Sequence, residues 1–246
     1  MTSEHTPEKK PIGRRDLLLK GGLGLGALAA GGPAFASGSN QSQLDRAASA
    51  EASMRAEAES LMVGGCTLTP SDVQGPFWIN SAMLRQDITE GVFGLPFTFY
   101  IKLVDAATCA PIVGAVVDVW HDDPDGKYSG FASEGTAGLT YLRGIQITGL
   151  DGMVRFESVY PGWYTGRTPH LHLKINPNAG SELTTQLYFP EEISTRAYLL
   201  PPYDTHGPSP VVNSTDAFFN PDLLMRMRTP TGGITQLIAG KRIAIQ

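Results

Sequence analysis

The sequence predicts a mainly β protein: a β-sandwich with irregular loops and a short helical linker near the N-terminus. Two observations lead to this fold class. Short runs of β-branched and aromatic residues alternate with polar positions along much of the 246-residue chain, as in Phe97-Thr-Phe-Tyr-Ile-Lys-Leu-Val104. Dense turn sequences such as Asp122-Asp-Pro-Asp-Gly126 separate these runs, at a spacing that is typical of sandwiches.

Residues 1–36 have the form of an export signal. Arg14-Arg15 ends a polar start, a glycine-rich apolar run follows, and Ala34-Phe-Ala36 has the small-x-small form of a signal-peptidase site. The apolar run is too short and too rich in glycine to be a stable membrane span. The arginine pair predicts the twin-arginine route, with an ordinary secretory signal as the alternative. We therefore expect a secreted or periplasmic protein.

Residues 37–62 are rich in Ala, Ser and Glu and have only weak helical periodicity, so we expect a linker that is helical over 44–62. The remainder, 63–246, is long enough for one β-rich domain. Within this domain, the pattern predicts a terminal hairpin around Gly240 and a short helix at 216–225, after an irregular, proline-rich stretch at 201–210. Strands are expected at 97–104, 115–120, 144–148, 153–159, 171–175 and 185–189.

Charge and cysteine content restrict the partners and the redox state. Beyond residue 36 the chain carries 14 basic and 21 acidic residues, a formal charge of −7. This balance argues against nucleic acid and anionic membrane surfaces as partners, because both need a basic footprint. Cys66 and Cys109 are the only two cysteines, and in an exported chain they are expected to form a disulfide, with two unpaired buried thiols as the alternative.

His170-Leu-His172 is the sharpest local feature. On a strand, His170 and His172 share one face while Leu171 points to the other, so two imidazoles can converge on a metal. Alone, the pattern fits a solvated strand face equally well. An iron(II) site of the cupin type needs a carboxylate close behind, yet the next acid is Glu182. Tyr164 precedes the histidines instead, and a phenolate ligand requires a strongly Lewis-acidic ion such as iron(III).

From Cys66 to about Phe189, an ordered set of motifs resembles the intradiol ring-cleavage dioxygenases, that is, the catechol, protocatechuate and hydroxyquinol enzymes. Each motif alone is weak, but together and in this order they are highly specific. The motifs are Gln74-Gly-Pro-Phe77, Pro111-Ile-Val-Gly-Ala-Val-Val-Asp-Val-Trp120, Asp125-Gly-Lys-Tyr128, Leu142-Arg-Gly-Ile-Gln146, Pro161-Gly-Trp-Tyr164 and Arg167-Thr-Pro-His170-Leu-His172.

The resemblance implies a mononuclear non-haem iron(III) held by Tyr128, Tyr164, His170 and His172, with Tyr164 and His172 as the axial ligands. It also implies that Tyr164 accepts a substrate proton and that Arg167 stabilises negative charge that develops on the ring. The substrates would be a small aromatic diol and dioxygen, and the product a muconate-type diacid. Weaker assignments place four residues in the substrate pocket: Gln186, Tyr160, Trp163 and Leu95.

The chain also departs from the family pattern. Only two residues separate Tyr164 from Arg167, a compact form that resembles exported, single-domain relatives. Gln74 stands where many relatives have Glu, and no long N-terminal helical dimerisation domain is visible. His121 is expected to be structural or on the surface, facing away from Trp120, and His206 receives no role. The competing functions are a cupin-like iron(II) dioxygenase and a non-catalytic, transthyretin-like binding protein.

Overall fold

A computed structural model of the chain describes residues 37–178, 180–228 and 232–246, so the expected export signal at 1–36 lies outside the described residues. The chain divides into two units, Met1–Leu44 and Asp45–Gln246. Of the first unit, only the beginning of helix α1 (Ser37–Leu61) is described. Within the described part of the chain, no helix combines the length and the apolar character needed to cross a bilayer. The second unit contains all the strands that the structure describes.

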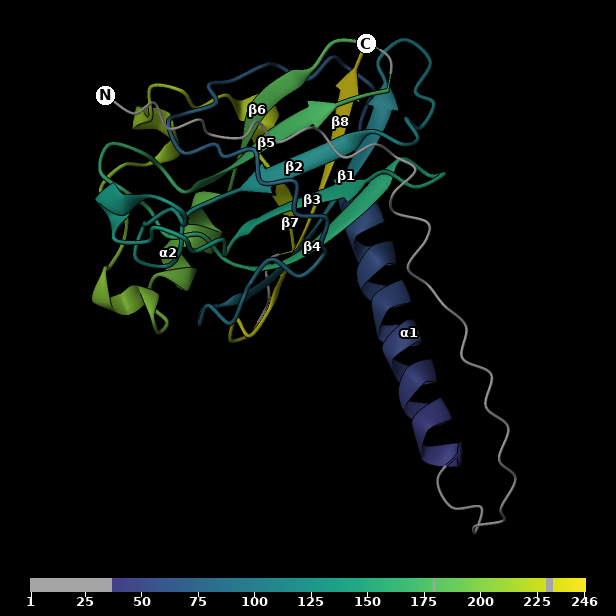
Figure 1. Cartoon of the computed structure of the whole chain (residues 1–246), viewed down its shortest axis with the longest axis horizontal. Coiled ribbons are helices and arrows are strands. Elements are labelled where there is room, and N and C mark those ends of the chain that lie inside the picture. Colours follow the sequence, from purple (N-terminus) through teal and green to yellow (C-terminus); the bar gives the residue numbers. More distant parts are fainter. Residues whose placement is uncertain (1–36, 179, 229–231) are drawn as a thin grey trace, which may run out of the picture. The chain divides into compact units, whose positions relative to one another are not determined.

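The second unit is a sandwich of two four-stranded sheets, which confirms the predicted fold class (Figure 1). One sheet has the order β4-β1-β8-β7, and the other has the order β3-β2-β5-β6. Helix α2 (Glu191–Ala197) and four short 3-10 turns lie in the connections. The strands are β1 (Pro96–Asp105), β2 (Val116–Trp120), β3 (Arg143–Ile147), β4 (Met153–Val159), β5 (His170–Asn176), β6 (Leu183–Tyr188), β7 (Arg226–Met227) and β8 (Leu237–Ile245).

The core lies between the sheets and is built by alternation along each strand. On β1, Phe97 and Phe99 are buried in the core, and on β5 the same holds for Leu171 and Leu173. Burying a side chain of this size contributes about 1.5–3 kcal/mol, so the inward face of each strand is strongly specified. The even-numbered residues of β5 therefore point to the outer face of their sheet, where loops cover them.

Two predictions in the C-terminal part hold only in part. No turn lies at Gly240, because β8 runs straight through this residue and pairs with β1 in parallel, but β7 and β8 form a short antiparallel pair with Arg226 opposite Gly240. A Cβ atom there would lie 2.4 Å from the carbonyl oxygen of Ala58, so helix packing rather than a turn explains the glycine. The helix predicted at 216–225 is reduced to the 3-10 turn Pro221–Leu223, which the Asn220 side chain caps.

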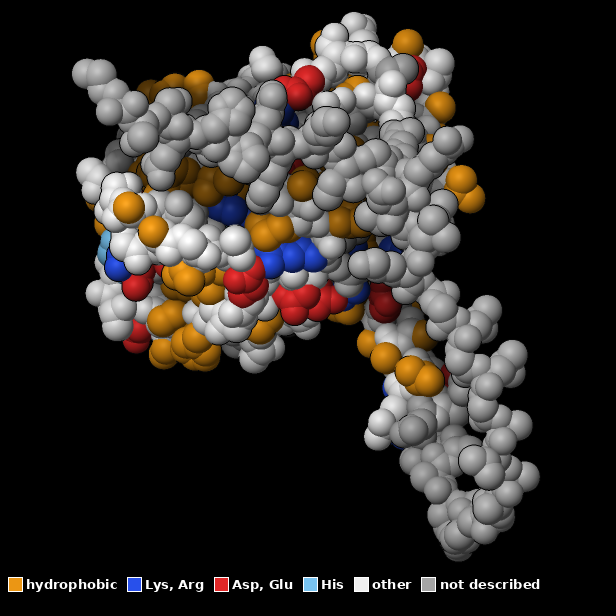
Figure 2. All heavy atoms as spheres, in the orientation of Figure 1, with side chains coloured by type: hydrophobic (Ala, Val, Ile, Leu, Met, Phe, Trp, Pro, Cys, Tyr) orange, Lys and Arg blue, Asp and Glu red, His pale blue; other side chains and the backbone are white. Residues whose placement is uncertain are grey.

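Helix α1 is more than a linker at its C-terminal end. Ala58 is fully buried, and it forms a small apolar cluster with Met62, Tyr100 and Met153. Arg155 on β4 adds ion pairs, at 2.8 Å to Glu157 of its own strand and at 3.5 Å to a glutamate of the helix, Glu51. Figure 2 shows basic and acidic side chains close together on the face in view.

Candidate functional site

Strand β5 presents two imidazoles on the outer face of its sheet, as the alternation predicts. His170 and His172 are almost completely buried, and their Nε2 atoms lie 3.2 Å apart. The Nδ1 atom of His170 lies 2.7 Å from the carbonyl oxygen of Thr168, which must accept a hydrogen bond from an Nδ1–H group. The pKa of His170 is lowered to about 3, mainly by burial and secondly by the positive charge of Arg167. The ring is therefore neutral, with the Nε2 lone pair directed at His172.

Two tyrosines from separate loops complete this cluster. The hydroxyl of Tyr164 lies 3.3 Å from Nε2 of His170. The hydroxyl of Tyr128 is buried and makes no hydrogen bond to any described residue, and the rings of Tyr128 and Tyr164 are 5.8 Å apart at their centroids. Burial is the largest cause that raises the pKa of both phenols, and for Tyr128 it raises the pKa well above the usual value. A phenolate at either position therefore needs a positive charge beside it.

These four side chains fit a cation such as iron(III). The Nε2 lone pair of His170 faces Nε2 of His172, and a buried hydroxyl without a partner is costly unless something binds it. A metal ion between them would satisfy all of these atoms, and its charge would favour deprotonated phenols. Among the described residues, no group of three or more His, Cys, Asp or Glu side chains could hold a metal.

Aromatic rings hold the candidate ligands in place. Trp120 on β2 pairs in register with His172, and the two rings stack at 5.0 Å with planes only 3° apart. Phe77 stacks on Tyr128 at 4.3 Å. The segment that carries Phe77 crosses closely over β5 at Gly75, where the backbone has a φ of +68° and a Cβ atom would lie 3.2 Å from His172 Cε1. Glycine suits both requirements.

Gly126 has a similar function in the turn before Tyr128. Its φ is +79°, and a Cβ atom there would lie 2.1 Å from the backbone oxygen of Trp163, the residue before Tyr164. Any larger residue would push the two loops apart. The glycine therefore allows the loops that carry the two tyrosines to pack against each other.

Arg167 lies beside the cluster and is held from several sides. Its Nε donates to Asp216 Oδ2 at 2.9 Å, and its Nη2 donates to Gln186 Oε1 at 2.6 Å. Its Nη1 lies 3.3 Å from the Tyr164 hydroxyl and 3.4 Å from His170 Nε2. Both partners of the ion pair with Asp216 are buried. The guanidinium is thus a fixed positive charge at the two ligand candidates.

Asp216 was not expected from the sequence, because it lies far along the chain from Arg167. Burial alone would raise the pKa of its carboxyl group, but hydrogen bonds from the amides of Phe218 and Thr168, together with Arg167, lower the pKa overall. Phe218 also covers the guanidinium, with 4.8 Å between the Arg167 Cζ atom and the ring centroid. Only the structure brings these side chains together.

The residues assigned to a substrate pocket divide into two groups. Gln186 on β6 lies at the site, in register with His172 and bonded to Arg167. Trp163 packs elsewhere: its ring stacks on His206 at 4.0 Å, and its indole donates to the carbonyl of Gly207. The structure places Leu95 and Tyr160 in the hydrophobic core instead.

His121 and the two cysteines have structural positions. His121 is fully buried, with its ring nitrogens 2.7 Å from the carbonyl oxygen of Asp122 and from the Ser158 hydroxyl. Its role is therefore structural, and it does not lie on the surface. Cys66 and Cys109 form a disulfide, with their Cα atoms 5.6 Å apart. This bond ties the segment after α1 to the turn between β1 and β2.

Comparisons with known proteins agree with this geometry. A family profile described as "Dioxygenase" matches residues 73–198. The solved structure of an intradiol ring-cleavage dioxygenase from Tetranychus urticae is 30% identical, with a TM-score of 0.68, and covers 74% of this chain and 95% of its own. The dioxygenase domain of a carbohydrate-binding fusion protein from Streptomyces sp. SirexAA-E is 29% identical, with a TM-score of 0.57, over 73% of this chain and 98% of its own.

Curated relatives give the same assignment over a shorter stretch. Chlorocatechol 1,2-dioxygenase of Rhodococcus opacus is 30% identical over 162 residues, which is 53% of this chain and 60% of the relative. Catechol 1,2-dioxygenase 1 of Acinetobacter lwoffii is 26% identical over 54% of this chain and 53% of its own. The chain thus spans a little over half the length of these curated relatives. From the profile, the fold and the relatives together, the chain belongs to the intradiol ring-cleavage dioxygenase family.

Proposed function

We propose that this protein is an exported dioxygenase that opens catechol-type aromatic diols between their two hydroxyl groups, with dioxygen, to give muconate-type diacids. One observation carries the proposal. The Nε2 atoms of His170 and His172 face each other at 3.2 Å, beside the Tyr164 hydroxyl and the unpartnered hydroxyl of Tyr128. Family membership supports the substrate class, because several relatives are named catechol or chlorocatechol 1,2-dioxygenases.

The four side chains would hold a mononuclear non-haem iron(III) ion. Tyr128 and Tyr164 would bind through phenolate oxygens, and His170 and His172 through Nε2. When bound, the ion supplies a Lewis-acid centre at which both oxygens of a catechol-type diol can bind. Trp120 and Phe77 would keep the ligand rings in position, since each of them stacks on one ligand.

Tyr164 is the ligand candidate best placed to move a proton. It is only partly buried, in contrast to Tyr128, and Arg167 donates a hydrogen bond to its hydroxyl. A phenolate oxygen in this position can accept a proton from a substrate hydroxyl and return it later. Arg167 then offers a fixed positive charge to the negative charge that ring opening develops, because Asp216 and Gln186 prevent it from turning away.

Three measurements on the purified protein test this function together. We expect one iron per chain, a visible band from tyrosinate-to-iron(III) charge transfer, and consumption of dioxygen when catechol is added. A colourless iron protein that consumes oxygen would instead support an iron(II) dioxygenase of the cupin type. A protein that binds no iron would support a transthyretin-like binding function. Either result would contradict the proposal.

Export by the twin-arginine route is part of the proposal and rests on Arg14-Arg15 and the weakly apolar run behind them. This route can move a protein that is already folded and loaded with metal, so it would suit an iron enzyme. Replacing both arginines with lysine should stop export, which immunoblots of cell and exported fractions would measure. Normal export of that variant would show that the general secretory route is used.

A further inference from the structure

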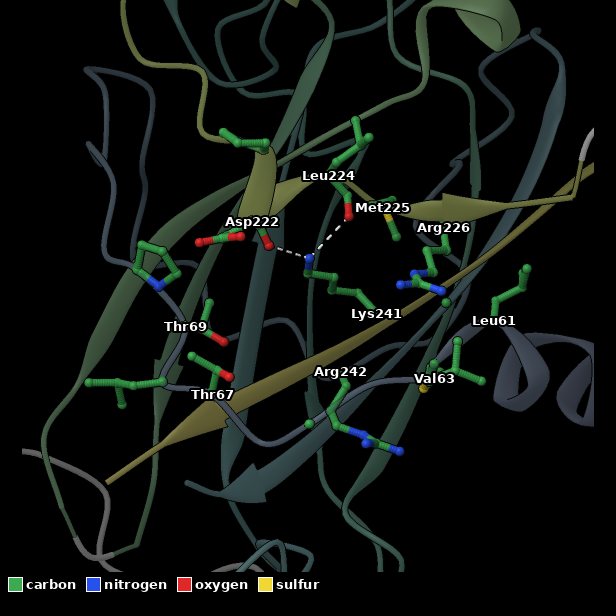
Figure 3. A pocket seen from close by; sticks show the side chains of 16 residues that line it. Leu61, Val63, Thr67, Thr69, Asp222, Leu224, Met225, Arg226, Lys241 and Arg242 are labelled. Atoms are coloured by element: carbon green, nitrogen blue, oxygen red, sulfur yellow. Dashed lines mark hydrogen bonds between the residues drawn. The ribbon is translucent and has the colours of Figure 1, made fainter. Parts of the chain in front are cut away.

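A pocket lies beside β8 and shares no residue with the candidate metal centre. Its volume is about 440 Å³, which is in the usual range for sites that bind small molecules. Figure 3 shows the residues that line it, which come from the end of α1, the segment after it, the turn before β7, and β7 and β8. The pocket therefore collects side chains from segments far apart in the sequence.

The pocket exists because one edge of β8 is only partly covered. Strand β7 pairs with β8 no further than Arg226 opposite Gly240. Four residues beyond Gly240, Thr69 covers the same edge, since its amide donates to Ala244 and its hydroxyl accepts from the Ala244 amide, each at 2.9 Å. Backbone groups alternate in direction along a strand, so the amide of Arg242 points to the same side as those of Gly240 and Ala244. It points into the uncovered part of the edge.

Among the described residues, three cationic side chains and one acid, Asp222, line this pocket. Lys241 Nζ donates to the carbonyl oxygens of Asp222 at 2.5 Å and Leu224 at 3.0 Å, which leaves its third N–H group available (Figure 3). Burial lowers the pKa of Lys241 to about 8, so the amine is still mostly protonated at neutral pH. Arg226 is exposed beside it.

Arg242 adds a donor that no described residue satisfies. Its Nη1 donates to the carbonyl of Gly64, but its Nε–H is buried and has no hydrogen-bond partner in the part of the chain that the structure describes. A buried N–H group on a charged side chain costs more than a neutral one when it is left unpaired. The pocket thus contains hydrogen-bond donors without acceptors, and more basic than acidic side chains, among its described residues.

We propose that this pocket binds a small oxyanion, a carboxylate or phosphate group of a compound that fits its volume. Arginine is suited to such groups because its planar fork donates two parallel hydrogen bonds. Arg226 and Arg242 would contact the anion from two sides. The apolar lining, which includes Leu61 and Val63, would accommodate a short carbon chain.

Calorimetric titration of the purified chain, at constant ionic strength, tests the proposal with two probes. Sodium phosphate represents phosphoryl compounds, and adipate, a saturated six-carbon dicarboxylate, represents organic acids. The choice of adipate rests on the proposed function, whose product is a diacid, whereas the choice of phosphate does not. Failure of adipate alone would therefore leave both the pocket and the enzyme activity standing, and would assign the site to phosphate groups.

The expected result is saturable one-site binding of at least one probe. Arg226→Gln and Arg242→Gln should each weaken it at least about tenfold, the usual effect of losing one charged hydrogen bond. Arg196→Gln, which removes a cation from α2 outside the pocket, should leave the affinity unchanged. Thermal unfolding checks that each variant is folded, and Arg226 is exposed enough to carry the test if Arg242→Gln is not. Absence of saturable binding, or equal affinity in all variants, would overturn the proposal.

Discussion

Replacing Arg167 with glutamine should change turnover and stability by separate mechanisms. Loss of one preorganised donor at a developing charge typically lowers turnover by about 10²- to 10³-fold. The same change leaves the carboxylate of Asp216 buried with no ion-pair partner. Breaking a buried pair from one side costs about 3–5 kcal/mol, and we expect the lower end because the amides of Thr168 and Phe218 still donate to Asp216. For a domain of this size, about 3 kcal/mol corresponds to a fall in Tm of roughly 6–12 °C.

A double variant separates the two effects. Asp216→Asn in the Arg167→Gln background removes the unpaired charge but turns its NH2 group toward one of the two amides that donate to Asp216, so it should restore part of the stability. It cannot restore turnover, because no positive charge returns to Tyr164 and His170. The assays are oxygen consumption with catechol, divided by the iron bound, and thermal unfolding. Near-normal turnover per iron in Arg167→Gln would refute a catalytic role, as would recovery of turnover together with stability in the double variant.

Three further predictions concern other residues. Tyr128→Phe should remove much of the visible band and of the activity, measured by absorbance and oxygen consumption, because one phenolate is lost. Replacing Cys66 and Cys109 with alanine removes a disulfide that joins two residues 43 positions apart in the sequence. This should lower the free energy of unfolding by about 4 kcal/mol, measured in urea. Asp118→Asn should stabilise the protein at pH 7.5 more than at pH 4, by about 2 kcal/mol in urea titrations, because burial raises the pKa of Asp118 to about 6.

The sign of the Asp118 effect follows from the direction of the shift. A carboxyl group whose folded-state pKa is raised favours folding below its unfolded pKa of about 4, and this contribution is lost as pH rises through about 6. Asparagine does not ionise, and it can still accept the hydrogen bond that Trp78 gives to Asp118 at 3.0 Å. An equal effect of Asp118→Asn at both pH values would contradict this reasoning. An unchanged spectrum in Tyr128→Phe would remove that residue from the site.

Local patterns were sufficient for the strands but not for their partners. The strand predicted at 97–104 is β1, Pro96–Asp105, because alternation of apolar residues records directly which face is buried. The hairpin around Gly240 was only partly right because alternation does not say which strands lie alongside: β8 pairs with β1 along its whole length and with β7 only at Ala239 and Gly240. Helix α2 was missed although Glu191 and Glu192 in its first turn and Arg196 in its last turn are recognisable signals.

The candidate site shows the same division. Tyr128, Tyr164 and the two histidines follow from motifs, because each stands at a fixed spacing from a landmark such as Trp120. The stacking of Trp120 on His172 depends on the register between β2 and β5, which a single sequence does not contain. The link from Arg167 to Asp216 joins two loops with no shared pattern.

The place of β8 in its sheet has a consequence for how the chain reaches this fold. Phe97 pairs with Leu237, and Asp105 with Ile245, so β1 acquires its second neighbour only from the far end of the sequence. Such non-local pairing raises the contact order, and domains of this kind fold slowly because loop-closure entropy must be overcome first. During that interval, β1 has one open edge, flanked by Phe97, Phe99 and Ile101. Open apolar edges of this kind promote association between chains, so the yield of soluble protein depends on how quickly residues 237–245 join the sheet.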